Sequence, residues 1–548
     1  MNEWTGGPSG CLGLEEMKEV TDAFGWIDWG IVALYMVFTT VLGERLSGKQ
    51  STIKDFFLGG KSLPWWAVTG SMIATEISAL TFIGVPGGVY AAQGDWTYLQ
   101  WGIGSIIARF AVGYWLVPLY YEKEIYSPYD FMGNRLGEGV RRLVTVLFSL
   151  GAVLGASVRV VVTAVILKAV TGMDAMLCIV VIGAFAVLWT FLGGMQTVIW
   201  TDVIQFCLFI FGGLLALGWL VTSLGWDQIV GLNQTTSLEG TAINKMEIFN
   251  LASPFTEEGR ALKFTLWVGL FAMPFQNFAA FGIDQLNTQR MFCCGNAKDA
   301  RKAMCWSSVS ILITLVMLAV GSGLFAWYQV NVPSAELAAA FSEDGNNVFP
   351  AWIVTVLPVG LSGLILAGAF AAAISSLDSV LAALSQTSLS IFYGREKLED
   401  ESKGKERVLQ SRIAVCIWGV ILTVVTLGLW NAYMSGEAKD LIGLAFGMVA
   451  YTFGPLLGIL LAAIFLTGRN LTPGLIVGSS LSVFFVAWFR PEILTVLENL
   501  KMDDVAKFVI ASRPELASEW FFPINAGLTL LCGWLGKLIL DGLAESQS

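Results

Sequence analysis

The stretch "SMIATEISALTFIGVPGGVY", residues 71–90, is apolar enough to lie in a membrane, yet it contains a carboxylate, Glu76. It is rich in small, hydroxylated and β-branched residues and ends on Pro86-Gly87-Gly88, a composition at which a helix is easily broken. Unwound backbone inside a membrane frees carbonyl groups that can coordinate a cation. The stretch therefore predicts a discontinuous membrane helix beside an ion site.

The whole chain has the composition of an all-α polytopic membrane protein. Of its 548 residues, 55% are hydrophobic and 14% charged, and the mean hydropathy is +0.68. Soluble proteins carry about 25% charged residues. Apolar runs of about 20 residues, each able to cross about 30 Å of hydrocarbon, recur along the chain. We predict about 13 spans, at residues 27–46, 65–91, 99–121, 141–171, 176–192, 198–222, 263–284, 303–330, 356–392, 412–431, 440–467, 472–489 and 521–541.

Several function classes are disfavoured by what the sequence lacks. It has no histidine, no GxxxxGK[ST] motif for ATP and no zinc-type cysteine spacing. We find no constellation of nucleophile, base and oxyanion donors typical of an enzyme. We therefore expect no catalytic residues, no ATP or nucleic-acid binding and no bound metal other than a hard cation.

Basic residues predict the orientation in the membrane. Lys and Arg accumulate in the loops after the first, third, seventh and ninth spans, which lie on one side under this span count. The opposite loop at 223–262 has only Lys245 and Arg260. Since basic loops remain in the cytoplasm, we expect a cell-membrane protein with residues 1–26 outside and the C-terminus inside.

Five ionisable side chains stand out inside the predicted spans: Glu76, Arg109, Arg159, Asp202 and Asp378. Such groups are costly in a bilayer and mark either an ion or substrate pathway or a buried pair. One interpretation is that the carboxylates and arginines pair with each other and fix the helix bundle. The other is that the carboxylates form a cation site.

The segment around Asp378 favours a cation site. Ser375, Ser376, Asp378 and Ser379 present oxygens within one and a half helical turns. Na⁺ is a hard cation suited to carboxylate, hydroxyl and carbonyl oxygens, and a soft-metal site is not expected without His or clustered Cys. A second candidate break, at Pro274 in the seventh span, lies five spans after the first. That spacing predicts two five-helix repeats, each beginning with a discontinuous helix.

Four motifs in order resemble the sodium:solute symporter family: "FFLGGKSLPWWAVTGSMIA" (56–74), "GGMQTVIWTDVIQ" (193–205), "GIDQLNTQR" (282–290) and "LPVGLSGLILAGAFAAAISSLDS" (357–379). The resemblance runs from about Trp26 to Gly478. It implies the leucine-transporter-like five-plus-five inverted repeat with extra helices, and alternating access driven by a sodium gradient. The implied units are an N-terminal segment (1–26), an extra helix (27–46), repeats at 65–222 and 263–467 joined by the 223–262 loop, and C-terminal helices with a short tail (468–548).

The resemblance also implies the ion ligands. The main sodium site would use backbone carbonyls and two hydroxyls, from Ala74, Ile77, Ala372, Ser375 and Ser376. In some relatives a second site uses the aspartate of the "TD" motif, and the corresponding residues here are Asp202, Ser375, Asp378 and Ser379. Some of these relatives carry a hydroxyl where this chain has Asp378. That carboxylate could tighten a second Na⁺, accept a proton or pair with a base.

The solute is predicted only by class. The resemblance implies Thr81, Gln100 and Asn277 as substrate residues, and Glu76, Ser78, Trp96 and Arg159 are further candidates. Arg159 could hold a substrate carboxylate through its bidentate fork, or it could neutralise Glu76 or Asp202. Trp96, Phe82 and Trp101 could form a hydrophobic lid, or belong to an interfacial aromatic belt.

We expect a sodium-coupled symporter that imports a small polar organic solute, such as a sialic acid, an amino acid or a monocarboxylate. A sugar or polyol symporter is the alternative, and a transporter-like sensor is a weaker one. The expected partners are Na⁺, the solute and the lipid bilayer.

Overall fold

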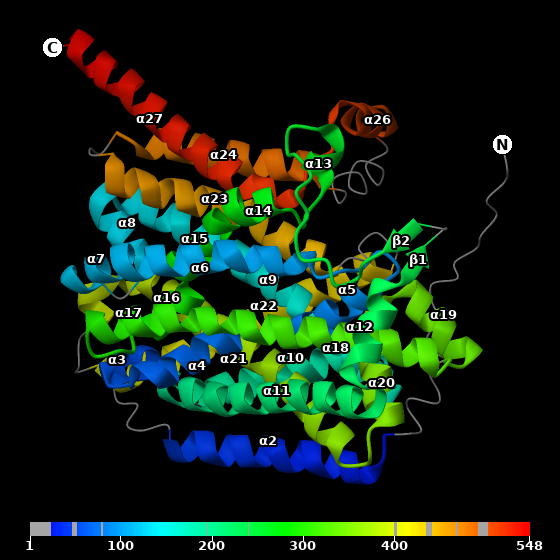
Figure 1. The fold of residues 1–548 in the computed structure, drawn as a ribbon. Coiled ribbons are helices and arrows are strands. Elements are labelled where there is room, and N and C mark those ends of the chain that lie inside the picture. The colour runs from blue at the N-terminus through cyan, green and yellow to red at the C-terminus, as the bar shows by residue number, and fades with distance from the viewer. Residues whose placement is uncertain are drawn as a thin grey trace.

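A computed structural model describes residues 24–46, 52–77, 80–125, 127–192, 194–238, 241–398, 403–434, 441–466, 470–490 and 502–547. Within these ranges, ten helices are long and apolar enough to cross a membrane, and two further helix pairs would do so as bent units. With the shorter apolar helix at 175–191, they match the thirteen predicted spans. Most helices run side by side across the molecule (Figure 1). The protein is thus a multi-pass, all-α membrane protein.

The helices fall into two sets of five spans with additions at both ends. The first set comprises α4 (Trp65–Glu76) with α5 (Val85–Tyr90), α6 (Trp101–Ala111) with α7 (Val117–Glu122), α9 (Glu138–Thr171), α10 (Ala175–Leu192) and α11 (Met195–Leu224). The second comprises α14 (Leu266–Phe271), α15 (Met273–Gly282) and α16 (Gln285–Met291) as one bent span, α17 (Ala297–Trp306) with α18 (Ser310–Val330), α21 (Leu361–Leu398), α22 (Gly404–Met434) and α23 (Leu441–Phe465). Outside these sets lie α2 (Trp26–Leu46), α24 (Thr472–Phe489) and α27 (Phe521–Gln547).

The connections contain short elements. These are α3 (Ile53–Leu58), α8 (Pro128–Leu136), α12 (Trp226–Gln234), α13 (Glu257–Ala261), α19 (Ala335–Glu343), α20 (Val348–Val356) and α26 (Asp503–Ser512). Strands β1 (Thr236–Leu238) and β2 (Thr241–Ile243) form an antiparallel hairpin. The predicted loop at 223–262 is therefore partly ordered, with α12, β1 and β2 gathered at one end of the bundle (Figure 1).

The first helix of each set is bent, as predicted, but the bends lie away from the prolines. The chain turns by 61° between α4 and the π-helical segment Leu80–Gly84 that leads into α5, and by 57° between α15 and α16. Pro86 and Pro274 instead occupy the first turns of α5 and α15, where a missing N–H costs nothing. Beside Pro274 the helix is interrupted at Ala272, between α14 and α15, but the span does not bend sharply there. The sharp bend follows Gly282, and Asp284 starts the new helix by accepting the Leu286 N–H at 2.9 Å.

The extra helix α2 is attached to the start of α21 by one carboxylate. Asp28 is fully buried, and its Oδ1 accepts hydrogen bonds from Gly360 N at 2.7 Å, Ser362 Oγ at 2.7 Å and Gly363 N at 2.9 Å. A helix N-terminus leaves N–H groups without intrahelical partners and favours a negative charge. A Cβ at Gly363 would lie 2.7 Å from the Asp28 Cα, so glycine is needed for this approach. Asp28 therefore caps α21 from another helix.

The loop after α12 is attached to the C-terminal end of α5. Lys245 is fully buried, and its Nζ donates to Ala91 O at 2.6 Å and lies 4.8 Å from the Phe325 ring centroid. Its backbone N donates to Asn233 O at 2.9 Å. The ammonium thus binds a carbonyl just beyond the C-terminus of α5, where a positive charge is favourable.

We expect Asp28→Ala to lower the free energy of unfolding by about 2 kcal/mol, because buried N–H donors at the start of α21 lose their acceptor. Thermal unfolding of the detergent-purified protein measures this as a lower Tm. Asp227→Ala, which removes an exposed aspartate from α12, is the matched control and should leave the Tm unchanged. Equal Tm values for Asp28→Ala and wild type would contradict the assignment.

We expect Lys245 to make stability depend on pH. Burial lowers the pKa of Lys245 to about 8, against the opposing charge of Asp95, whereas an unfolded lysine has a pKa of about 10.4. Between these values the unfolded chain holds a proton that the folded chain has released, so this site favours folding more as the pH rises. The Tm of wild type minus that of Lys245→Met should increase between about pH 8 and pH 10 and stay constant below about pH 7. Lys123→Met, at a side chain 53% exposed, should show no such trend.

Candidate ion and solute sites

A buried polar cluster joins four helices around Arg290. The Arg290 Nη2 donates to Asp202 Oδ2 at 2.9 Å, and its Nε donates to Ser71 Oγ at 2.8 Å. Ser71 Oγ in turn donates to Asp202 Oδ2 at 2.5 Å, while Ser375 Oγ donates to Asp202 Oδ1. All four side chains are fully buried. The cluster therefore links α4, α11, α16 and α21.

The four residues predicted for a second cation site, Asp202, Ser375, Asp378 and Ser379, lie together in this cluster. The guanidinium of Arg290 already lies among them. Ser379 Oγ donates to Ser375 O at 2.6 Å and to Asp378 Oδ1 at 3.0 Å. Ser379 also accepts a hydrogen bond from Arg290 Nη2, which places the guanidinium between Asp202 and Ser379. The buried carboxylates of Asp202 and Asp378 thus both lie close to the guanidinium of Arg290. The predicted seventh span ended at residue 284, which left Arg290 in the following loop, whereas the structure places it in the last turn of α16, inside the bundle.

The predicted main sodium ligands lie beside this cluster. Ala74 is near the end of α4 and Ile77 is its C-cap, and helix ends present their last carbonyls without intrahelical partners. Ala372 lies on α21, one turn before the fully buried Ser375 and Ser376. Helix α4 packs against both α21 and α11. Hard oxygen donors of the kind that Na⁺ prefers are therefore available from two neighbouring helices.

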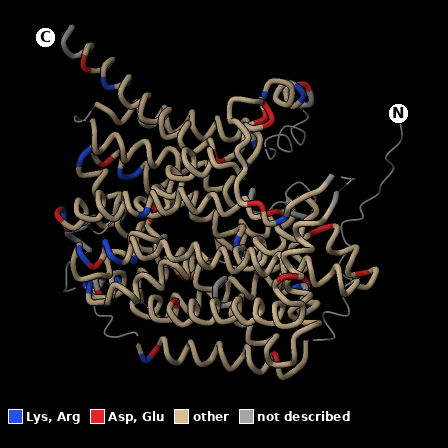
Figure 2. Tube along the Cα trace, viewed as in Figure 1, with Lys and Arg blue, Asp and Glu red and all other residues tan. Residues whose placement is uncertain are grey.

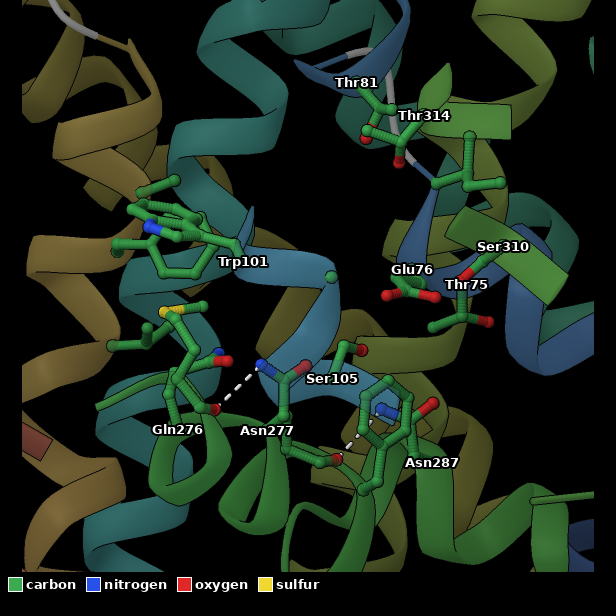
Figure 3. A pocket seen from close by; sticks show the side chains of 18 of the residues that line it. Thr75, Glu76, Thr81, Trp101, Ser105, Gln276, Asn277, Asn287, Ser310 and Thr314 are labelled. Carbon is green, nitrogen blue, oxygen red and sulfur yellow. Dashed lines mark hydrogen bonds between the residues drawn. The ribbon is translucent and has the colours of Figure 1, made fainter. Parts of the chain in front are cut away.

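A cavity of about 220 Å³ opens on the other side of the α4 break. Its polar lining comes from both bent spans and their neighbours: Thr75, Glu76, Thr81, Ser105, Arg159, Gln276, Asn277, Asp284, Asn287, Ser308, Ser310 and Thr314. Figure 3 shows Glu76 and Thr75 facing Ser105 and the amides of Asn277 and Asn287 across the cavity. The apolar walls include Trp101, Met273 and Phe453. This mixture of apolar walls and a few convergent polar groups is typical of a small-molecule site.

The cavity lining contains three ionisable side chains, Glu76, Arg159 and Asp284. Glu76 forms an ion pair with Arg109, which is fully buried, donates to Ser310 Oγ at 2.9 Å and lies 4.1 Å from the Phe281 ring centroid. Asp202 is paired with Arg290. Arg159, in contrast, faces the cavity with a buried Nη1 that has no hydrogen-bond partner. The interpretation that Arg159 neutralises Glu76 or Asp202 therefore fails, because other arginines occupy both partners.

Three predicted solute or lid residues lie elsewhere. Trp96 is buried, with its Nε1 donating to Ser322 Oγ at 2.9 Å. Gln100 is buried, and its amide donates to Thr97 O and Phe264 O, both at 3.2 Å. Phe82 packs against Phe209 and Phe349. These contacts hold helix ends and loops together, and none of the three side chains lines the cavity. The prediction of Trp96 and Gln100 as solute residues and of Trp96 and Phe82 as a lid is therefore corrected. Ser78 lies outside the described residues.

Sequence reasoning missed several residues of both sites. Ser71 and Arg290 belong to the ion cluster, while Gln276 and Asn287 belong to the cavity. The signal available for Arg290 was its place directly after a polar run in the motif "GIDQLNTQR", where a basic residue also fits a cytoplasmic loop. The amides of Gln276 and Asn287 carried no such signal in the sequence, because a single amide near the end of a span has no preferred environment.

The fold and the two candidate sites are typical of a class: a secondary transporter with two five-helix repeats, bent first helices, a buried oxygen-rich cluster and an adjoining polar-lined cavity. The model of the sodium:solute symporter family matches residues 56–479. The chain belongs to the sodium:solute symporter family.

Individual relatives agree with this assignment. The chain is 27% identical to the sodium/sialic acid symporter SiaT of Proteus mirabilis over 451 residues, covering 82% of this chain and 86% of the relative. It is 27% identical to a sodium/glucose cotransporter of Vibrio parahaemolyticus over 494 residues, covering 86% and 87%. The solved structure of a substrate-bound, outward-open Na⁺-coupled sialic acid symporter superposes with a TM-score of 0.74 at 23% identity, covering 94% of this chain and 98% of that one. The leucine-transporter-like fold is thereby confirmed.

Proposed function

We propose that the protein is a sodium-coupled symporter that imports a small polar organic solute bearing a carboxylate, by alternating access. The observation that carries the carboxylate is Arg159, whose buried Nη1 faces the cavity without a partner. Asp284, which also lines the cavity, interacts electrostatically with Arg159 but does not bond to its Nη1. A bidentate solute carboxylate would complete the hydrogen bonds of the guanidinium. The cavity, at about 220 Å³, is smaller than the roughly 300–1,000 Å³ of drug-sized sites, which favours a small solute.

Coupling follows from the shared break in the first span. The end of α4 carries Ala74 and Ile77, the proposed sodium ligands, and also Thr75 and Glu76, which line the cavity. Na⁺ bound between this end and Ser375–Ser376 on α21 would fix the position of Glu76. By linkage, an ion that orders the cavity wall raises solute affinity, and the solute raises ion affinity by the same factor. Na⁺ is cargo in this scheme, and Ala74, Ile77, Ala372, Ser375 and Ser376 would hold it.

The second cation set takes a different role in this proposal. Because Arg290 already contacts Asp202 and Ser379, a second Na⁺ at Asp202, Ser375, Asp378 and Ser379 would have to share their oxygens with a guanidinium. We propose that Arg290 supplies the positive charge there and keeps α16 attached to α11 and α21. Asp378 remains available for a proton or a shared ion.

The alternative solute is a sugar or polyol. Its support is the group of amides on the cavity wall, Gln276, Asn277 and Asn287, of which Asn287 Oδ1 is buried without a hydrogen-bond partner. A hydroxyl-rich solute would satisfy these groups but would leave Arg159 unpaired. Comparing the uptake of carboxylic acids with the uptake of neutral sugars, each measured with and without Na⁺, distinguishes these two classes of solute.

We place the protein in the cell membrane with its N-terminus outside and its C-terminus in the cytoplasm, as a transporter and not an enzyme. Lys and Arg gather at the end of the bundle where α7, α8 and α17 lie (Figure 2), as expected for the cytoplasmic side. The repeat boundaries 65–222 and 263–467 remain predictions.

We expect Ser376→Ala, which removes a proposed ligand, and Asp202→Asn, which leaves the charge of Arg290 uncompensated beside the sodium site, each to raise the Na⁺ concentration for half-maximal solute uptake by about tenfold, which corresponds to a loss of about 1.4 kcal/mol of ion binding. Uptake into proteoliposomes over a range of inward Na⁺ gradients measures this. Ser482→Ala, which removes a buried hydroxyl on α24, is the control. Unchanged sodium dependence in both variants would reject the ion site. Equal wild-type uptake in potassium or choline would reject symport altogether.

We expect Arg159→Gln to abolish uptake of the carboxylate solute, with at least a tenfold loss of affinity, because the carboxylate loses its charged partner. Arg159→Lys should retain part of the affinity, since the charge remains but the bidentate geometry is lost. Competition by acids and by their neutral amides measures the difference. Equal losses for acids and amides would indicate a structural role for Arg159.

A further inference from the structure

The cavity presents more acidic than basic side chains to a solute. Glu76, Asp284 and Arg159 line it, whereas Arg109, which pairs with Glu76, is fully buried and lies outside the lining. Asp284 also interacts electrostatically with Arg159. A solute that carried only a carboxylate would bind Arg159 but would place a third carboxylate beside the two already there, and neighbouring like charges repel. The lining therefore favours a solute that has a cationic group as well.

Glu76 has one oxygen in its ion pair and one oxygen free for a solute. Its Oε2 is buried against the guanidinium of Arg109. The side chain as a whole is still 31% exposed, and Figure 3 shows it facing Ser105 across the cavity. Within the described part of the chain, no donor contacts Oε1. Because each carboxylate oxygen accepts hydrogen bonds through two lone pairs, a donor on the solute can bind there.

The end of α4 is suited to a positive charge. Glu76 is the last residue of α4, and the C-terminal end of a helix dipole is negative. Tyr98 and Trp101 line the same cavity with their ring centroids 5.4 Å apart, and Tyr98 interacts electrostatically with Glu76. Aromatic faces attract ammonium groups. A carboxylate oxygen, a helix C-terminus and aromatic rings therefore all favour an ammonium group at this wall.

We propose that the solute is a zwitterionic amino acid, whose carboxylate binds Arg159 and whose ammonium group binds Glu76. This inference rests on the proposed function, which supplies the carboxylate, and adds the second charged group. Arg109 is a positioning residue, since it holds Glu76 from behind and does not reach the solute. An uncharged donor such as a hydroxyl would bind Glu76 without offsetting the extra carboxylate.

The test is thermal stabilisation of the purified full-length protein in NaCl. The probes are the common L-amino acids, β-alanine and γ-aminobutyrate, each beside its N-acetyl derivative, which loses the positive charge, and its primary amide, which loses the carboxylate. A ligand that binds the folded state raises the Tm with its concentration. We expect at least one amino acid to reach its midpoint at a concentration about tenfold below that of either derivative.

A double variant, Glu76→Gln with Arg109→Gln, removes both charges of the pair, so that neither is left uncompensated. It should bind this amino acid and its N-acetyl derivative with similar midpoints, because the group that distinguishes them is gone. Glu76→Asp should keep part of the preference. The matched control is Asp130→Asn with Arg141→Gln, which removes an ion pair of 3.7 Å outside the cavity and should leave the ratio of midpoints as in wild type.

The inference is overturned if no amino acid stabilises the wild type, or if the N-acetyl derivatives stabilise it equally well. An unchanged ratio of midpoints in the folded double variant overturns it too. The wild-type comparison needs no variant, so it decides the matter even where the double variant does not fold. The proposed carboxylate solute survives these outcomes where acids still bind better than amides and Arg159→Gln removes that preference, and it fails where acids and amides stabilise the wild type equally.

Discussion

The ion pair between Arg290 and Asp202 is the interaction on which the rest of this structure depends. In a low-dielectric interior, removing one member of a buried pair leaves an uncompensated charge that costs several kcal/mol. The pair is completed by the hydroxyls of Ser71 and Ser375, which come from two further helices. The first bent span, its counterpart in the second repeat, α11 and α21 are therefore joined at one point.

This constraint explains why the ion and solute sites are neighbours. The bend after α4 frees backbone carbonyls on one side and exposes Glu76 to the cavity on the other. Glu76 is paired with Arg109, while the Nη1 of Arg159 has no hydrogen-bond partner. In the proposed mechanism the end of α4 would contact both the ion and the solute, so no longer pathway is needed to couple them.

The helix outside the repeats also has a physical role. Asp28 caps α21, which carries the proposed sodium serines, and Tyr35 of the same helix approaches Gln205 on α11. A helix that contacts both ion-bearing helices can fix their spacing. Capping from a separate helix satisfies N–H groups that would otherwise be unpaired inside the membrane, where no water replaces them.

The sequence by itself determined the membrane class, the thirteen spans, the two bent helices and the acids near the ion site, because hydrophobic length and the cost of a buried charge are local properties. Spacing within α21 also placed Ser375, Ser376, Asp378 and Ser379 on one helix correctly. The partners of the charges were decided only by the tertiary structure. The pairs of Arg109 with Glu76 and of Arg290 with Asp202 are contacts between distant segments. From the sequence alone, every pairing of these arginines and acids balances the charges equally well. For the same reason Trp96 and Gln100 looked like solute residues: whether a polar side chain faces a cavity or a neighbouring carbonyl depends on how the helices pack.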